Sequence, residues 1–288
     1  MQGLVLDANS FLGRRLVAAL AQDGHAVRVP SGDWRDKRTL AAALETCDVC
    51  FHLLPTAPPD RDSAVDLLRD VAPTVQLLQM CVESRVRKIV FASAADAIYG
   101  PASPLPTPET ALPSPISGNG VHALAIENYL GLFTRTRGLG SVSLRLGCLY
   151  GEHQRPPASQ GRLAAILAAA LHGEAIEIDG DGTKVHDYLY VGDAASALIK
   201  AASYAGADAV FNVGSGVGRS TNEVVDAIED VMGQRLARRY RATGSIDASR
   251  SILAIDRAAR DLGWSPSVAF SEGLVRTYRW MRVATGTR

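Results

Sequence analysis

Short apolar runs alternate with helical segments along the first half of the chain, and this alternation limits the possible folds more than any other feature. The helical segments cover residues 11–21, 38–45, 63–84 and 121–137, and the apolar runs cover residues 3–6, 26–29, 49–52, 88–92 and 142–146. Strands separated by helices predict βαβ units with a parallel sheet and right-handed crossovers. We therefore expect an α/β protein with a doubly wound parallel sheet, whose ligands lie beyond the carboxyl ends of the strands.

The regular alternation ends near residue 150. Helices are expected at 161–173 and 193–205, and a short strand at 211–214. Ser220 and Glu223 have the spacing of a capping box, which opens a further helix. We expect a first domain over residues 1–150 with returning segments from 187–214, and a small C-terminal substrate-side lobe made mainly of residues 151–288.

Charge and composition exclude several classes of protein. The 288 residues carry 30 Lys plus Arg and 30 Asp plus Glu, a net charge of zero, whereas a nucleic-acid or anionic-membrane binder shows a basic excess. No apolar run reaches the roughly 18 residues that a membrane helix needs, and the N-terminus lacks the pattern of a signal peptide. We expect a cytoplasmic protein whose partner is a small molecule, with no nucleic acid and no membrane.

Several segments together resemble one family. They are residues 180–193, which include Asp187-Tyr188 and end on Val191-Gly-Asp193, together with 51–53, 150–156, 211–216 and 261–274. In their order along the chain, these segments resemble the extended short-chain dehydrogenase/reductase family, the sugar-nucleotide epimerases and dehydratases. The resemblance spans nearly the whole chain. It implies a Rossmann-type domain, NAD or NADP as cofactor, a role in biosynthesis and a homodimer formed by the helices at 63–84 and 121–137.

The dinucleotide loop departs from the family pattern of three glycines. Its positions are Asp7, Ser10 and Gly13, so only the third glycine remains, and Asp7 is expected to place a carboxylate where a pyrophosphate would lie. The acidic residue that the family uses for the ribose aligns with Ser31. Gly13, Asp33 and Trp34 remain as remnants of a cofactor site, or Asp33 only caps the turn before the next helix. We therefore expect no cofactor to bind tightly.

The catalytic pair that the resemblance implies is also missing. The family's Tyr and Lys, four residues apart on one helix, align with Asn119 and Ala123. No lysine lies between Lys88 and Lys184, so no shift of the alignment restores the pair. The family's Ser or Thr aligns with Ala95, and Ser93 lies two residues earlier.

Residues that hold the substrate phosphates in the family are altered as well. An Asn of the family aligns with Cys148, and two Arg residues align with His186 and Gly244. A thiol beside an imidazole can act as a nucleophile or as an acid/base pair, so Cys148 and His186 are candidate catalytic residues. The further candidates are His122, Ser93 and Asp96, which could also line a pocket without taking part in chemistry.

No metal site is expected. Cys47, Cys50 and His52 are close in sequence, but a structural zinc ion needs four ligands and the sequence offers no second pair. Buried cysteines that act as small apolar residues are the better interpretation.

Three functions remain open at this point. The main expectation is a family member with a degenerate active site, whose pocket is repurposed for non-redox chemistry of the isomerase, lyase or cyclase type. The first alternative is a non-catalytic homologue that binds a metabolite or a partner protein. The second is a surviving NAD-dependent sugar-nucleotide epimerase, dehydratase or reductase.

Overall fold

A six-stranded parallel sheet forms the centre of the fold. The computed structural model describes residues 1–53, 67–101, 104–154, 161–207, 209–242 and 250–286. The strand order is β2-β1-β3-β4-β5-β9, with β1 at Gln2–Val5, β2 at Ala26–Arg28, β3 at Val49–Leu53, β4 at Lys88–Ala94, β5 at Gly140–Leu146 and β9 at Val210–Val213. Since β2 and β3 lie on opposite sides of β1, the winding reverses there, and ligands of such sheets bind beyond the carboxyl ends next to that point.

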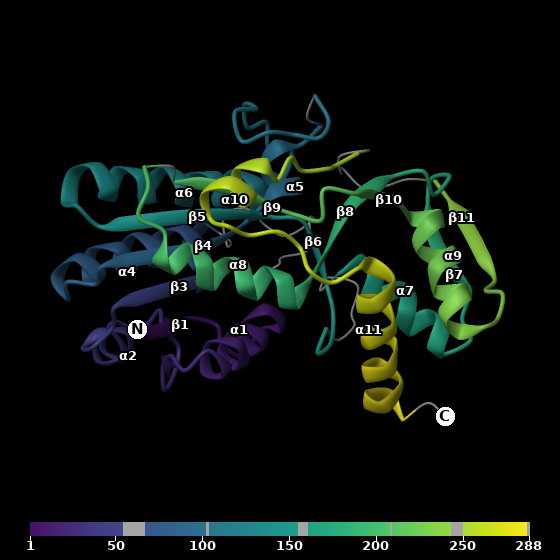
Figure 1. The fold of residues 1–288 in the computed structure, drawn as a ribbon, viewed down its shortest axis with the longest axis horizontal. Coiled ribbons are helices and arrows are strands. Elements are labelled where there is room, and N and C mark those ends of the chain that lie inside the picture. The colour runs from purple at the N-terminus through teal and green to yellow at the C-terminus, as the bar shows by residue number, and fades with distance from the viewer. Residues whose placement is uncertain (54–66, 102–103, 155–160, 208, 243–249, 287–288) are drawn as a thin grey trace.

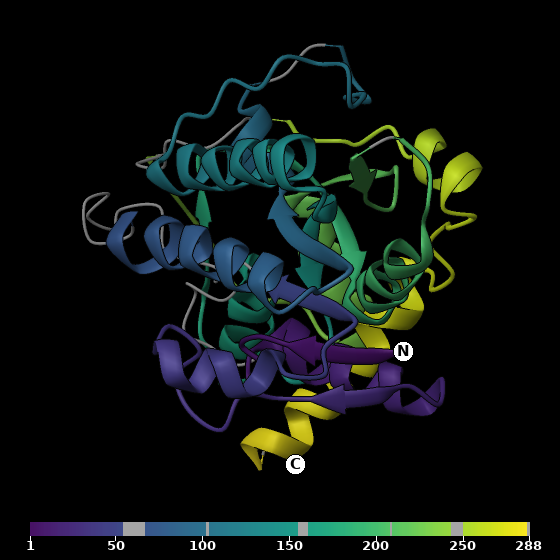
Figure 2. The ribbon, with the colours of Figure 1, turned by 90° about the vertical axis from the view of Figure 1, so that its left-hand side faces the viewer.

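Helices cover both faces of this sheet, as Figure 2 shows. One face carries α2 (Lys37–Leu44), α4 (Ala72–Glu83) and α6 (Gly118–Arg137), and the other carries α1 (Phe11–Gln22) and α8 (Val191–Ser203). Strand β3 supplies both layers, because alternate side chains point to opposite faces: Val49 and Phe51 pack toward α1, whereas Cys50 packs toward α2 and α4. The predicted doubly wound α/β fold is confirmed.

The helix expected at 63–84 is divided. Residues 63–66 lie outside the described part of the chain, a π-helical turn η1 covers Leu67–Val71, and α4 begins at Ala72. Pro73 stands in the first turn of α4 and has no N–H to donate to the turn before it. The regular helix therefore starts only at the proline.

The remaining elements form a smaller group beside the end of the sheet that lies opposite the N-terminus (Figure 1). Two small sheets join β10-β8-β6 and β11-β7. Their strands are β6 (Cys148–Tyr150), β7 (Ile176–Asp179), β8 (Val185–Tyr190), β10 (Gly218–Ser220) and β11 (Arg238–Arg241). The helices here are α7 (Arg162–Leu171), α9 (Thr221–Met232) and α11 (Phe270–Thr285), while α5 (Ala95–Tyr99) and α10 (Asp256–Asp261) lie beside the large sheet.

The predicted capping box at the start of α9 is present. Ser220 Oγ accepts the amide of Glu223, and the Glu223 carboxylate accepts the amide of Ser220. In the described part of the chain, no helix combines the length and the apolar character that crossing a membrane requires.

Candidate functional site

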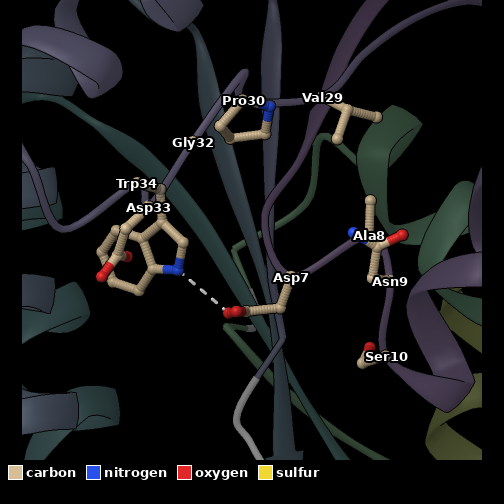
Figure 3. A pocket seen from close by; sticks show the side chains of 9 residues that line it. All are labelled: Asp7, Ala8, Asn9, Ser10, Val29, Pro30, Gly32, Asp33 and Trp34. Carbon is tan, nitrogen blue, oxygen red and sulfur yellow. Dashed lines mark hydrogen bonds between the residues drawn. The ribbon is translucent and has the colours of Figure 1, made fainter.

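A cavity of about 210 Å³ opens at the carboxyl ends of β1 and β2 (Figure 3). Its walls come from the loop before α1 and from the loop after β2, and the residues that line it are Asp7, Ala8, Asn9, Ser10, Val29, Pro30, Gly32, Asp33 and Trp34. Whole small-molecule sites measure roughly 300–1,000 Å³. This cavity therefore suits one part of a dinucleotide, at the place where a doubly wound sheet binds one.

The loop between β1 and α1 keeps the tight form that glycines usually provide. Asp7 has a φ of 53°, a left-handed conformation that Asp tolerates better than most residues. A Cβ on Gly13 would lie 2.4 Å from the carbonyl oxygen of Asp7 and 2.8 Å from the Cα of Ala8, so only glycine allows α1 to pack this closely on the loop. The remnant glycine has a packing role.

The two residues that replace the family's first and second glycines make different contacts. Ser10 is the N-cap, and its Oγ accepts the amide of Gly13 at 3.0 Å. The Asp7 carboxylate turns the other way, toward Trp34 across the cavity and away from Ser10 (Figure 3). The Asp7 carboxylate therefore lies on the Trp34 side of the cavity, whereas Ser10 lies at the start of α1.

Two groups lie against the Asp7 carboxylate at the cavity wall. The indole Nε1 of Trp34 donates to Asp7 Oδ2 at 3.0 Å, and the Arg35 guanidinium Nη1 lies 3.9 Å from Asp7 Oδ1. Burial raises the pKa of Asp7 above its usual value, although the bond from Trp34 and the charge of Arg35 both lower it. Removal from water is thus the largest influence on the pKa of this carboxylate.

The loop after β2 supplies the opposite wall. Trp34 is buried and stacks under the Arg35 guanidinium, whose Cζ lies 4.6 Å from the ring centroid. Asp33 is exposed, and its Oδ1 accepts the amide of Arg35 at 3.0 Å. Asp33 therefore stabilises the turn, while the N-cap of α2 is Asp36. Ser31, where the family has its ribose carboxylate, is exposed.

Helix α6 carries the positions where the resemblance expects the catalytic pair. Ser117 caps its start, and Asn119 and Ala123 follow in its first two turns. His122 is buried one turn before Ile126, on the side of α6 that packs into the core. Its Nδ1 has no hydrogen-bond partner among the residues that the structure describes.

A buried ion pair connects α6 to the sheet. Arg145 of β5 binds both carboxylate oxygens of Glu127, with Nη2–Oε2 at 2.7 Å, and Ser93 Oγ donates to Glu127 Oε1 at 2.8 Å. The Arg145 guanidinium also stacks on the Tyr99 ring. Candidate Ser93 is therefore hydrogen-bonded to this ion pair. The pair itself was not predicted from the sequence, although a lone arginine in the apolar run 142–146 was a signal for it.

A second polar cluster brings two of the candidates together. His186 Nδ1 lies 3.2 Å from Asp96 Oδ2, and Ser251 Oγ donates to Asp96 Oδ1. Cys148 pairs in register with Tyr188, two residues beyond His186, so Cys148 and His186 share one face of the small sheet. No interaction that the structure records among its described residues joins Ser93, Asp96 and His122 to one another. Gly244 lies outside those residues.

The cysteines near β3 are core residues. Cys47 and Cys50 are buried, and burial raises the pKa of the Cys47 thiol to about 12. His52 is also buried, and burial lowers its pKa to about 4, so its ring is neutral. Within the described ranges, no three metal-binding side chains come together.

Comparison with known proteins identifies the family. The NAD dependent epimerase/dehydratase family matches residues 4–214. The chain belongs to this family. It is 31% identical to the UDP-glucose 4-epimerase of Mycolicibacterium smegmatis, over 98% of this chain and 99% of that protein.

Solved structures of related proteins resemble this chain over nearly its whole length. A UDP-glucose 4-epimerase from Thermotoga maritima, solved with UDP-glucose, superposes with a TM-score of 0.93 at 31% identity and covers 99% of this chain and 100% of its own. One from Thermus thermophilus, in complex with NAD, gives a TM-score of 0.91 at 29% identity, with coverage of 99% and 100%.

These comparisons overturn two expectations from the sequence. The expected non-redox pocket is wrong, because the relatives that match this family member over its full length are UDP-sugar 4-epimerases. The expectation that no cofactor binds tightly is also wrong, because the family is NAD dependent and the neighbours include NAD complexes. The physical reason lies in the loop: the Asp7 carboxylate is bound by Trp34, and Ser10 caps α1 by accepting the amide of Gly13, so both side chains have partners within the protein.

Proposed function

We propose that this protein is an NAD-dependent enzyme that acts on a nucleotide sugar, with UDP-glucose 4-epimerisation as the first reaction to test. One observation carries the proposal: the cavity at the carboxyl ends of β1 and β2 lies at the dinucleotide position of a fold that matches an NAD-bound 4-epimerase over 99% of the chain. The match covers 99% of this chain and 100% of that structure, so it also includes the residues after 214.

The residues of the cavity fit the adenosine and pyrophosphate parts of a dinucleotide. The first amides of a helix lack partners within the helix and attract anions, and Ser10 satisfies that of Gly13 while leaving the end of α1 open toward the cavity. Trp34 offers an apolar wall for the base. A bound nicotinamide ring would supply hydride transfer, and the protein would supply its position and the surrounding charges.

Proton transfer at the sugar requires groups other than a Tyr–Lys pair, since positions 119 and 123 are Asn and Ala. Candidates Ser93, Asp96, His122, Cys148 and His186 remain predictions for this role. Tyr99 is a poor replacement, because burial raises its pKa and its hydroxyl donates to Asn212 Oδ1 at 2.8 Å. His122 is the first residue to test, because its buried imidazole is one residue from Ala123 and histidine is the side chain that most often transfers protons in enzymes.

The test is turnover of UDP-glucose with NAD, followed by proton NMR of the sugar. We expect the C4 epimer to accumulate, and we expect His122→Gln to lower the rate by about 100- to 10,000-fold if His122 transfers the proton. His172→Gln is the matched control, because His172 is exposed at the end of α7. Binding of both ligands without any change in the sugar would contradict an enzymatic role.

We also propose that the protein acts as a homodimer in the cytoplasm. Support for the dimer comes from exposed apolar side chains on α6, namely Val121, Tyr129 and Leu132. An apolar stripe on a helix that already packs its other side on a sheet suits an isologous contact with a second copy. The cytoplasmic location follows only from the sequence-based expectation above.

A further inference from the structure

The proposed cofactor site lacks a ribose-binding carboxylate at the usual place. In doubly wound folds an acidic residue hydrogen-bonds the 2′-hydroxyl of the adenosine ribose when the cofactor is NAD. The resemblance places that acid at position 31, which is an exposed serine here. An uncharged hydroxyl makes a weaker hydrogen bond than a carboxylate. The cavity must therefore obtain this interaction from another side chain or do without it.

Asp7 offers such an acceptor at the end of the neighbouring strand. Its carboxylate lines the cavity with 27% of the side chain exposed, and it points toward Trp34 on the side away from Ser10 (Figure 3). Trp34 occupies Oδ2. Among the described residues, no hydrogen bond to Oδ1 is formed, and the Arg35 guanidinium lies 3.9 Å from it.

Asp33, the other carboxylate of the cavity, is less suited to this role. Its side chain is 62% exposed, and its Oδ1 already accepts the amide of Arg35 and a guanidinium hydrogen at 3.2 Å. It resembles Asp7 in charge and size and lines the same cavity from the opposite wall. Asp33 is therefore the carboxylate to compare with Asp7.

We propose that Asp7 is the residue that accepts the ribose hydroxyls of the dinucleotide, in place of the acid missing at position 31, and that it selects NAD over NADP. This inference rests on the proposed function for the location of the cofactor. A 2′-phosphate would meet the carboxylate of Asp7, and like charges in contact are unfavourable. Arg35 does not offset this, because its guanidinium is shared among Asp7, Asp33 and Asp70.

The experiment is isothermal calorimetry of NAD and NADP with four proteins: wild type, Asp7→Asn, Asp7→Gly and Asp33→Asn. A hydrogen bond to a charged group predicts that both Asp7 variants bind NAD about 10- to 100-fold more weakly. The wild type binds NAD at least about 10-fold better than NADP, a preference that shrinks in Asp7→Asn. Asp33→Asn loses less affinity for NAD than either Asp7 variant, and an equal or larger loss in Asp33→Asn would assign the ribose contact to Asp33 and overturn the proposal.

The sign of the change decides between two roles for Asp7. If Asp7→Gly or Asp7→Asn binds NAD as tightly as the wild type or more tightly, the proposal is overturned and Asp7 is an obstacle to the cofactor. Asn and Gly both accept a positive φ, so the loop is preserved, and a thermal melt of each variant confirms folding. Failure of all four proteins to bind either dinucleotide overturns this inference together with the proposed function. Weaker NAD binding by the variants of a protein that does not convert UDP-glucose supports the inference and contradicts only the proposed reaction.

Discussion

Asp7 illustrates why a single substitution cannot be interpreted from alignment alone. By alignment it opposes a cofactor, yet Trp34, 27 positions later in the chain, turns its carboxylate to the other side of the cavity. The sequence contains no signal for that contact, because it depends on how the loops after β1 and β2 meet. The presence of a loop at this position was predictable, and the direction of its carboxylate was not.

Asp7 should reduce stability as the pH rises. Burial raises its pKa in the folded state, so the folded chain holds this proton more tightly than the unfolded chain does. The resulting loss of stability is absent below the unfolded pKa of about 3.9 and is complete once the pH exceeds the folded pKa. We expect Asp7→Asn without ligand to melt above the wild type, with a difference that grows from about pH 4 upward until the pH exceeds the folded pKa of Asp7. A difference that is constant or shrinks with pH would count against this.

Glu127 should be among the least replaceable charged residues. Glu127→Ala would leave the Arg145 guanidinium buried without its partner, and breaking such pairs costs about 3–5 kcal/mol in the free energy of unfolding. Glu272→Ala removes an exposed pair with Arg276 and should cost about 0–1 kcal/mol. Urea denaturation of both variants measures the contrast, and similar losses would refute the importance of burial here.

Strands buried on both sides were predictable because they are short apolar runs. The runs 49–52 and 88–92 agree with β3 and β4 to within two residues. The strands β10 and β11 were missed: β10 is Gly-Arg-Ser and β11 is Arg-Arg-Tyr-Arg, so hydrophobic periodicity gives no signal. The start of α6 lies three residues before its predicted position, because Ser117 caps the helix ahead of the first large apolar side chain.

Loss of the capping box of α9 should lower the free energy of unfolding by a small amount. Ser220→Ala removes the acceptor for the Glu223 amide and should lower the free energy of unfolding by about 0.5–2 kcal/mol. Ser203→Ala, at the exposed last residue of α8, should change it by less than about 0.5 kcal/mol. Equal effects in urea denaturation would show that the box contributes nothing.

The assembly of the whole protein can be tested through α6. We expect light scattering to report a dimer at micromolar concentration and Leu132→Glu to give a monomer, because a charge at 132 would be buried in the apolar contact. Val283→Glu introduces the same charge at an exposed position of α11 and should leave the dimer intact. A monomeric wild type would contradict the proposed assembly.

Family membership and architecture were predictable because many short motifs keep their order along the chain. Function was not predictable in this way, because each altered position, taken by itself, indicates only a loss of affinity for the cofactor or the substrate. Ser10 and Asp7 show the error: in the folded protein one caps α1 and the other lines the cavity. Neither substitution closes the site.

The melting temperature of the wild-type protein with and without NAD tests whether the protein binds this cofactor. A ligand at about 100 times its dissociation constant adds about 2.7 kcal/mol to the free energy of unfolding. At about 2–4 °C per kcal/mol for a chain of this size, the account predicts an upward shift of roughly 5–10 °C. A shift near zero with millimolar NAD would contradict an NAD-dependent enzyme.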